Sequence, residues 1–140
     1  MSLLNRHRLK ELALTRLSDA KLLIKGKRWD GAYYVCGYVV ECALKACIAK
    51  QTRRSDFPDK NTVEASYTHS LTKLVGIAGL KPRLDEEAAT DRIFEQNWGI
   101  VKDWSEDSRY QKHAQQEAQA LYEAIVDNTH GVLQWIRRYW

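Results

Sequence analysis

A charged pair interrupts the most apolar stretch of the sequence, WDGAYYVCGYVVECALKA. Tyr34, Tyr38, Glu41 and Lys45 follow one another at steps of four, three and four, so that all four share one narrow face of a helix. An exposed Glu–Lys pair on such a face contributes only about 0.3–0.5 kcal/mol. The same stripe could instead line a binding groove or a dimer seam, because tyrosines are enriched at interfaces. The spacing alone leaves both interpretations open.

A second candidate site is the pair Arg109 and His113, in SRYQKHA. If the last helix has already begun there, a spacing of four places both side chains on one face. A guanidinium and an imidazole together can contact a phosphate and move a proton at a ribose 2′-hydroxyl, which allows RNA cleavage without a metal. The alternative is an exposed basic pair at the start of a helix.

Other reactive side chains have simpler explanations. His69 follows a long polar segment and suits a capping or packing role better than catalysis. Cys36, Cys42 and Cys47 lack the spacing of zinc ligands and are expected to be buried, reduced thiols. No Gly-rich phosphate loop, GxSxG or HExxH motif occurs, so neither a metal nor another cofactor is expected.

The composition is that of one ordinary globular domain, residues 1–140. Hydrophobic residues make up 44% and charged residues 29% of the chain, values that argue against a disordered protein. The net charge of +4 is a mild basic excess, short of the dense patch of a strong DNA binder. No run approaches the ~18 apolar residues of a membrane span and no secretory signal is visible, so a cytoplasmic protein without a membrane partner is expected.

Helical periodicity recurs along the chain, and no alternation with a period of two is long enough for a sheet. The spacing predicts helices over residues 3–25 and 31–51, with Gly26 as a left-handed helix end and Asp30 as the next N-cap. A connection this short makes the two helices an antiparallel hairpin. Apolar residues cover about half the circumference of the second helix, which should therefore lie at the centre of the domain.

The later elements are predicted from the same spacing. Residues 52–66 form a long polar loop, Thr68 caps a short helix that ends near Gly79, and longer helices follow over 84–104 and from about 114 almost to 140. The fold class is all-α, an up-and-down helical bundle of four main helices plus one short helix. Three tryptophans on or beside the helical stripes are expected in its core: Trp98, Trp104 and Trp135.

The first hairpin, TRLSDAKLLIKGKRWDGAYYVCGYVVECALKACI, strongly resembles the HEPN domain (the higher eukaryotes and prokaryotes nucleotide-binding domain). The segments FPDK, YTHSLTKLVGIAGL and WSEDSRY look like later parts of that domain and occur in the same order. The resemblance covers about residues 12–126, nearly the whole chain, and the combination of segments is specific.

This resemblance implies a helical bundle that is commonly homodimeric, with a shallow polar groove at the dimer seam. Many prokaryotic members are encoded beside a minimal nucleotidyltransferase and act in toxin–antitoxin pairs, and others are implicated in nucleotide binding. Several branches are metal-independent ribonucleases, marked by Arg, four to six residues, then His at the start of a late helix. An acidic residue on the second helix often faces that site, and Glu41 matches it.

The ribonuclease mark is not met here, because only three residues separate Arg109 from His113, and SRY looks like the branch that lacks the mark. The resemblance therefore implies a dimeric binding and regulatory module that holds nucleotide or nucleic acid, with a nucleotidyltransferase as a possible partner. The ligand-binding residues expected are Glu41, Lys45, Tyr34, Tyr38, His69, Arg109 and Tyr110. The alternatives are an endoribonuclease using Arg109 and His113, and a purely structural dimeric partner.

Overall fold

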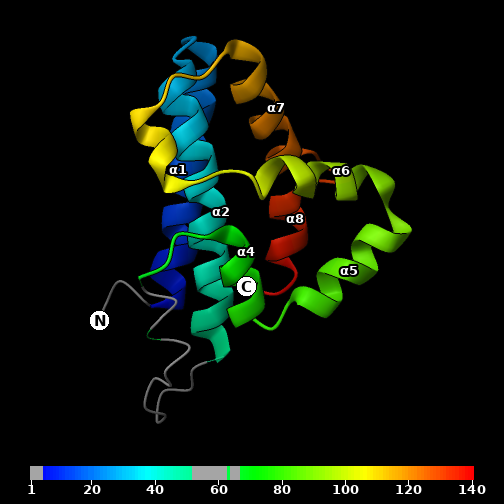
Figure 1. Ribbon diagram of the computed structural model, residues 1–140. Coiled ribbons are helices and arrows are strands. Elements are labelled where there is room, and N and C mark those ends of the chain that lie inside the picture. Colours follow the sequence, from blue (N-terminus) through cyan, green and yellow to red (C-terminus); the bar gives the residue numbers. More distant parts are fainter. Residues whose placement is uncertain (1–4, 52–62, 64–66) are drawn as a thin grey trace.

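The computed structural model describes residues 5–51, 63 and 67–140. Within these ranges the chain forms seven α-helices and one 3₁₀-helix, and no strand. In chain order they are α1 (Arg6–Lys25), α2 (Trp29–Gln51), α4 (Leu71–Ile77), α5 (Lys81–Thr90), α6 (Arg92–Val101), the 3₁₀-helix η2 (Glu106–Tyr110), α7 (Gln115–Val126) and α8 (Val132–Arg137). The all-α fold class is confirmed. Figure 1 shows α1, α2 and α7 side by side, with α5 and α6 extending to one side.

The predicted hairpin of α1 and α2 forms, but its turn differs from the prediction. Gly26 ends α1 at a φ of −82°, and its N–H donates to a carbonyl one turn earlier. The left-handed residue is Lys27, with a φ of 59°. Asp30 is not the N-cap of α2, because that helix begins at Trp29. The Asp30 carboxylate instead accepts the backbone N–H of His113 at 2.6 Å, which joins the start of α2 to the segment before α7.

The central element of the bundle is α2, as its wide apolar face predicts. Every residue from Val39 to Ile48 is buried, and α2 packs against α1, α4, α7, α8 and η2. By length and hydropathy α2 also meets the criteria for a membrane span, which the sequence prediction had excluded. Yet 67% of its most apolar window is buried inside the fold, and the core helix of a bundle passes the same test.

Both long helices predicted for the second half of the chain are broken in two. Asp91 ends α5 and starts α6, where its carboxylate accepts the N–H of Phe94 at 3.0 Å. Residues 127–131 separate α7 from α8, and a Cβ on Gly131 would lie 2.3 Å from the carbonyl oxygen of Asp127. The apolar periodicity continues across both breaks, so periodicity alone does not predict them. The helices end there because Asp91 caps α6 and the backbone is crowded at Gly131.

The short helix forms where it was predicted, with a different cap. Ser70, not Thr68, is the N-cap of α4, and its hydroxyl accepts the N–H of Lys73 at 3.3 Å. Gly79 follows the helix with a φ of 71°, the left-handed conformation that glycine adopts without strain. The predicted loop at 52–66 lies outside the described residues, apart from the exposed Val63.

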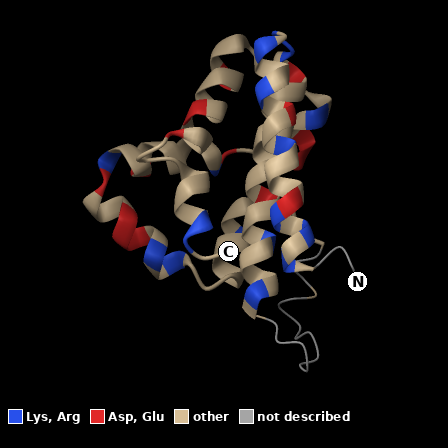
Figure 2. Ribbon diagram, turned by 180° about the vertical axis from the view of Figure 1, so that it is seen from behind, with Lys and Arg blue, Asp and Glu red and all other residues tan. Residues whose placement is uncertain are grey.

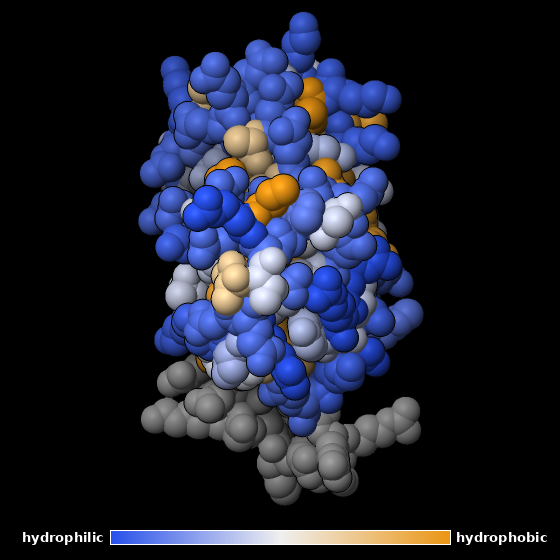
Figure 3. Space-filling view, turned by 90° about the vertical axis from the view of Figure 1, so that its right-hand side faces the viewer, coloured by the Kyte–Doolittle hydropathy of each residue, from blue (hydrophilic) through white to orange (hydrophobic). Residues whose placement is uncertain are grey.

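The core contains the cysteines, as predicted. All three are free and buried, and burial raises the thiol pKa to about 12 for Cys36 and Cys47 and to about 11 for Cys42. Of the three tryptophans expected there, Trp104 and Trp135 are buried, and Trp98 is half-buried. On the face shown in Figure 3, only small and separate hydrophobic spots lie among hydrophilic side chains.

Candidate functional site

Glu41 and Lys45 form a buried ion pair on α2. The Nζ atom of Lys45 lies 3.0 Å from Oε2 of Glu41, and the two side chains are 10% and 3% exposed. The interpretation of this pair as an exposed surface contact is therefore wrong. Both charges have lost most of their water, so their mutual attraction must be supplemented by other polar partners.

His69 is the first of those partners. It lies just before α4, with its Nδ1 atom 2.9 Å from Oε2 of Glu41 and its Nε2 atom 3.0 Å from Oε2 of Glu106, the first residue of η2. One imidazole thus joins three elements that are distant in sequence. A protonated ring donates to both carboxylates, whereas a neutral ring donates to only one of them.

Three buried polar atoms near this cluster have no hydrogen-bond partner among the described residues: Oε1 of Glu41, Nε1 of Trp104 and Oγ of Ser108. Leaving a buried polar group unpaired costs roughly 1–3 kcal/mol, and more when the group is charged. Native proteins usually satisfy such groups with ordered water, an ion or a ligand. The set consists of a carboxylate acceptor, an indole donor and a hydroxyl that can act as either.

Gly37 allows Trp104 to lie directly on α2. A Cβ at Gly37 would lie 2.1 Å from atoms of the indole ring, so a larger residue would displace that ring. The ring centroid of Tyr34 lies 6.1 Å from that of Trp104 and 6.4 Å from that of Tyr38. Burial, with Cys42 nearby, raises the pKa of Tyr38 to about 12. The stripe predicted from the sequence is thus an aromatic wall beside the buried ion pair.

A cavity of about 350 Å³ opens beside His69, Trp104 and Glu106. It is formed by the start of α4 and by the segment that leads from α6 into η2, and its functional lining is Tyr67, His69, Lys102, Trp104 and Glu106. Tyr67 and Lys102 are exposed. Aromatic rings, a cation and hydrogen-bonding side chains around one concave site are suited to a nucleotide.

Arg109 and Tyr110 are both exposed on η2, and the Arg109 guanidinium lies 4.8 Å from the centroid of the Tyr110 ring. Tyr110 chiefly, with Glu106 and Tyr34, raises the pKa of Arg109, so this side chain stays cationic. Arg109 therefore lies near Glu106, one of the two carboxylates that His69 contacts.

His113 is placed differently from what the helical spacing suggested. Because α7 begins only at Gln115, Arg109 and His113 do not share a helix face. The His113 side chain is 6% exposed, and its ring stacks on Tyr33 at 3.8 Å with an interplanar angle of 13°. Its Nδ1 atom lies 3.4 Å from Oε2 of Glu117. Of the residues predicted for the site, the structure thus brings Glu41, Lys45 and His69 into direct contact and holds His113 in a separate cluster.

Two residues of the site were not predicted from the sequence. Glu106 was not considered, and Trp104 was assigned to the core only. Both stand in WSEDSRY, whose acidic residues beside an arginine were the one available signal. No spacing rule connects positions 41, 69 and 106, because irregular segments separate them.

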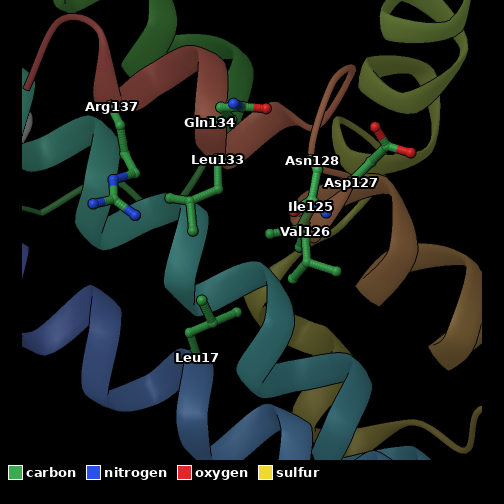
Figure 4. Close-up of a pocket in the computed structure, with 8 residues that line it drawn as sticks. All are labelled: Leu17, Ile125, Val126, Asp127, Asn128, Leu133, Gln134 and Arg137. Carbon is green, nitrogen blue, oxygen red and sulfur yellow. The ribbon is translucent and has the colours of Figure 1, made fainter.

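Another cavity, of about 410 Å³, lies between α1, the end of α7 and α8 (Figure 4). It is lined by Leu17, Ile125, Val126, Asp127, Asn128, Leu133, Gln134 and Arg137. Apolar side chains and single polar groups alternate there, without a cluster of titratable residues. Within the described part of the chain, no group of three or more His, Cys, Asp or Glu side chains is arranged to hold a metal ion.

The comparison with protein families gives one result. The family model described as HEPN domain matches residues 7–139, nearly the whole chain. No curated protein and no solved structure matches the chain. A match of this extent shows the family, and so the all-helical chain, with its buried Glu41–Lys45 pair in contact with His69, belongs to the HEPN domain family.

Proposed function

We propose that the protein is a HEPN-type binding and regulatory module that takes a nucleotide, free or within a nucleic acid, in the cavity lined by His69, Trp104 and Glu106. This cavity, here called the groove, lies next to Glu41, which His69 contacts. The observation that carries this proposal is the unpartnered Oε1 atom of Glu41. A buried carboxylate oxygen accepts hydrogen bonds only, and the hydroxyl groups of a ribose and the amino and imide groups of the bases are donors.

The surrounding residues supply the other contacts that a nucleotide needs. Tyr67 lines the cavity and is exposed, so it offers an aromatic face for a base, while Lys102 and the nearby Arg109 carry positive charge for a phosphate. Lys45 then holds the Glu41 carboxylate in place through their ion pair. Tyr34 and Tyr38 support the wall behind Trp104.

The experiment is isothermal titration of the purified protein with uridine and adenosine monophosphates and with a short oligouridylate. Glu41→Gln is compared with Glu123→Gln, which changes an exposed glutamate on α7. We expect Glu41→Gln to weaken binding at least about tenfold, the loss of one charge-assisted hydrogen bond, and Glu123→Gln to leave it unchanged. Equal affinities for the two variants would overturn the assignment of the groove.

The proposal includes a homodimer, with the groove at or near its seam. A residue of the second protomer that donates to Glu41 would satisfy the same oxygen without any ligand. Sedimentation equilibrium of wild type and Glu41→Gln separates these cases: a dimer that dissociates in the variant and binds no nucleotide would favour the purely structural partner.

The proposed setting is a cytoplasmic toxin–antitoxin or nucleotidyltransferase-associated system in a prokaryote, which the resemblance to HEPN proteins supports. Co-expression with a minimal nucleotidyltransferase, where one is encoded beside this chain, followed by affinity purification, tests this setting. A stable complex is expected, and its absence would remove the nucleotidyltransferase from the proposal while leaving the nucleotide-binding groove to be tested separately.

Ribonuclease activity is the second candidate, and the observation that favours it is His69 between two carboxylates with Arg109 nearby. This arrangement can transfer a proton, whereas His113 is buried against Tyr33. Cleavage of a mixed RNA pool in excess EDTA is measured for wild type, Arg109→Ala, His113→Ala and His69→Ala. Loss in Arg109→Ala and His113→Ala would support the sequence-based pair, and loss in Arg109→Ala and His69→Ala would support the His69 cluster. Intact RNA with wild type leaves the binding module.

A further inference from the structure

A separate cavity of about 520 Å³ lies at the other end of α2, between the α1–α2 turn and the segment that leads into α7. It is lined by Lys27, Arg28, Trp29, Asp30, Gly31, Lys112 and His113. Glu41 stands roughly 16 Å farther along the helix axis than Asp30, at the usual rise per residue, so this cavity is distinct from the groove. Figure 2 shows basic residues gathered at the turn that joins α1 and α2.

The charge of this cavity favours an anion. Lys27, Arg28 and Lys112 are exposed, and none of them forms an ion pair within the described part of the chain. The single carboxylate, Asp30, already accepts the N–H of His113. Three cations and one carboxylate therefore line the cavity, which leaves a positive excess.

The first turn of α2 adds donors. The backbone N–H groups of Trp29, Asp30 and Gly31 have no acceptor among the described residues, as is usual at a helix start, and these three residues line the cavity. The partial positive charge of a helix N-terminus and its free N–H groups together stabilise a bound phosphate.

His113 supplies an independent observation that points to a ligand. Its side chain is 6% exposed, it lines the cavity, and its Nε2 atom is buried without a hydrogen-bond partner among the described residues. Since Nδ1 faces the Glu117 carboxylate and donates to it, Nε2 carries a lone pair when the ring is neutral. A hydroxyl group is one donor that would satisfy this lone pair.

We propose that this cavity binds the phosphate and ribose of a ribonucleotide, either free or within an RNA strand. The phosphate lies against the start of α2 and the cations Arg28 and Lys112. A ribose hydroxyl donates to Nε2 of His113, and the base packs on the half-exposed indole of Trp29. This site does not depend on the groove around Glu41, and the two can be tested apart.

The experiment is an NMR titration of ¹⁵N-labelled protein with uridine 5′-monophosphate, with a short oligouridylate and with the matching oligodeoxyuridylate. The backbone amide signals of Trp29, Asp30 and Gly31 report the cavity, and the indole N–H signal of Trp104 reports the groove. We expect the cavity signals to shift with both ribonucleotide probes, and the oligodeoxyuridylate to bind more weakly because it lacks the 2′-hydroxyl. A response to the oligouridylate alone would identify the source as RNA, and a comparable response to the monophosphate would identify a free nucleotide.

Matched variants complete the test. Arg28→Ala with Lys112→Ala removes two cavity cations, and Lys21→Ala with Lys73→Ala removes two exposed cations elsewhere. We expect the first pair to weaken oligouridylate binding at the cavity signals at least about tenfold and the second pair less than about twofold. His113→Phe keeps a ring to stack on Tyr33 but removes the lone pair, so it should abolish the preference for RNA over DNA.

Two results would overturn this assignment: cavity signals that do not move at millimolar probe, or equal weakening by both pairs of substitutions, which indicates general attraction to a basic surface. Shifts at Trp29, Asp30 and Gly31 without a shift at Trp104 would support this site and contradict the groove proposal. A shift at Trp104 without shifts at Trp29, Asp30 and Gly31 would support the groove proposal and contradict this site.

Discussion

The Nδ1 atom of His69 lies 2.9 Å from a carboxylate oxygen of Glu41, although 28 positions separate the two residues in the sequence. Glu41 belongs to the most buried helix of the fold, and His69 is half-exposed at the edge of a cavity. Their contact connects a buried charge with a site that solvent reaches. Substitutions at Glu41 should therefore affect both stability and binding.

Glu41→Gln should lower the free energy of unfolding by about 3 kcal/mol, because Lys45 would remain buried without its counter-ion. The matched control is Asp85→Asn on α5, which breaks the Lys81–Asp85 pair of the same i,i+4 spacing, with side chains 60% and 62% exposed. That change should cost less than about 0.5 kcal/mol. Urea unfolding followed by circular dichroism measures both. A loss below about 0.5 kcal/mol for Glu41→Gln would show that the burial of this pair has little energetic weight.

Gly37→Ala should destabilise the protein by about 1–3 kcal/mol, since the new methyl group would occupy the space of the Trp104 ring. The Trp104 indole must move, so near-UV circular dichroism and the affinity of the groove for nucleotide should change together. Gly99→Ala in α6 is the control, because nothing lies within 4 Å of the position its Cβ would take. There the gain in helix propensity should stabilise by about 0.5–1 kcal/mol. Equal effects at the two glycines would contradict the close packing of Trp104 on α2.

The sequence predicted what depends on local periodicity. The two helices of the hairpin, the central position of α2 and the stripe of Tyr34, Tyr38, Glu41 and Lys45 follow from a repeat of 3.6 residues, and the short connection makes the hairpin antiparallel. The breaks at Asp91 and at 127–131 were missed, because a capping side chain ends a helix without interrupting its apolar pattern.

The composition of the site was predicted only in part, for a different physical reason. The contacts of His69 with Glu41 and Glu106 depend on how α4 and η2 pack on α2, and no local spacing encodes that packing. The capping interaction of Glu117 with the N–H of Ala114 starts α7 after His113, which removes the helical relationship assumed for Arg109 and His113. Tertiary packing and capping, rather than periodicity, decide which polar residues meet.

The three cysteines should resist thiol reagents at about pH 8 in the folded protein. Burial raises the pKa of Cys36 and Cys47 to about 12 and that of Cys42 to about 11, so the reactive thiolate is scarce and inaccessible. Labelling with iodoacetamide, followed by mass spectrometry, should proceed only after unfolding in urea. Lys21→Cys, which places a thiol on the exposed face of α1, serves as the positive control and should react rapidly. Fast labelling of the native cysteines in the folded chain would contradict the burial of α2.

A pH-dependent contact holds the loop between α7 and α8 against the break between α5 and α6. The Nδ1 atom of His130 lies 2.6 Å from Oδ2 of Asp91, and the carboxylate of Asp127 accepts the N–H groups of Thr129 and His130. The hydrogen bond to Asp91 raises the pKa of His130 above its usual 6.5. The same bond, with the N–H of Phe94, lowers the pKa of Asp91 below its usual 3.8.

The two shifts define where this contact stabilises the fold. A raised histidine pKa contributes stability that is complete below about pH 6.5 and is lost as the pH rises through the folded-state value. A lowered aspartate pKa contributes stability that is present above about pH 4 and is lost as the pH falls through its folded-state value. His130→Gln should therefore reduce the melting temperature most between about pH 4 and pH 6.5, and the difference from wild type should shrink at higher and at lower pH. Melting curves across this range test the window, with His7→Gln as the control, since His7 is exposed and lies 3.8 Å from Glu11. A difference that stays constant from acid to alkaline pH would show that His130 acts through packing alone, without its charge.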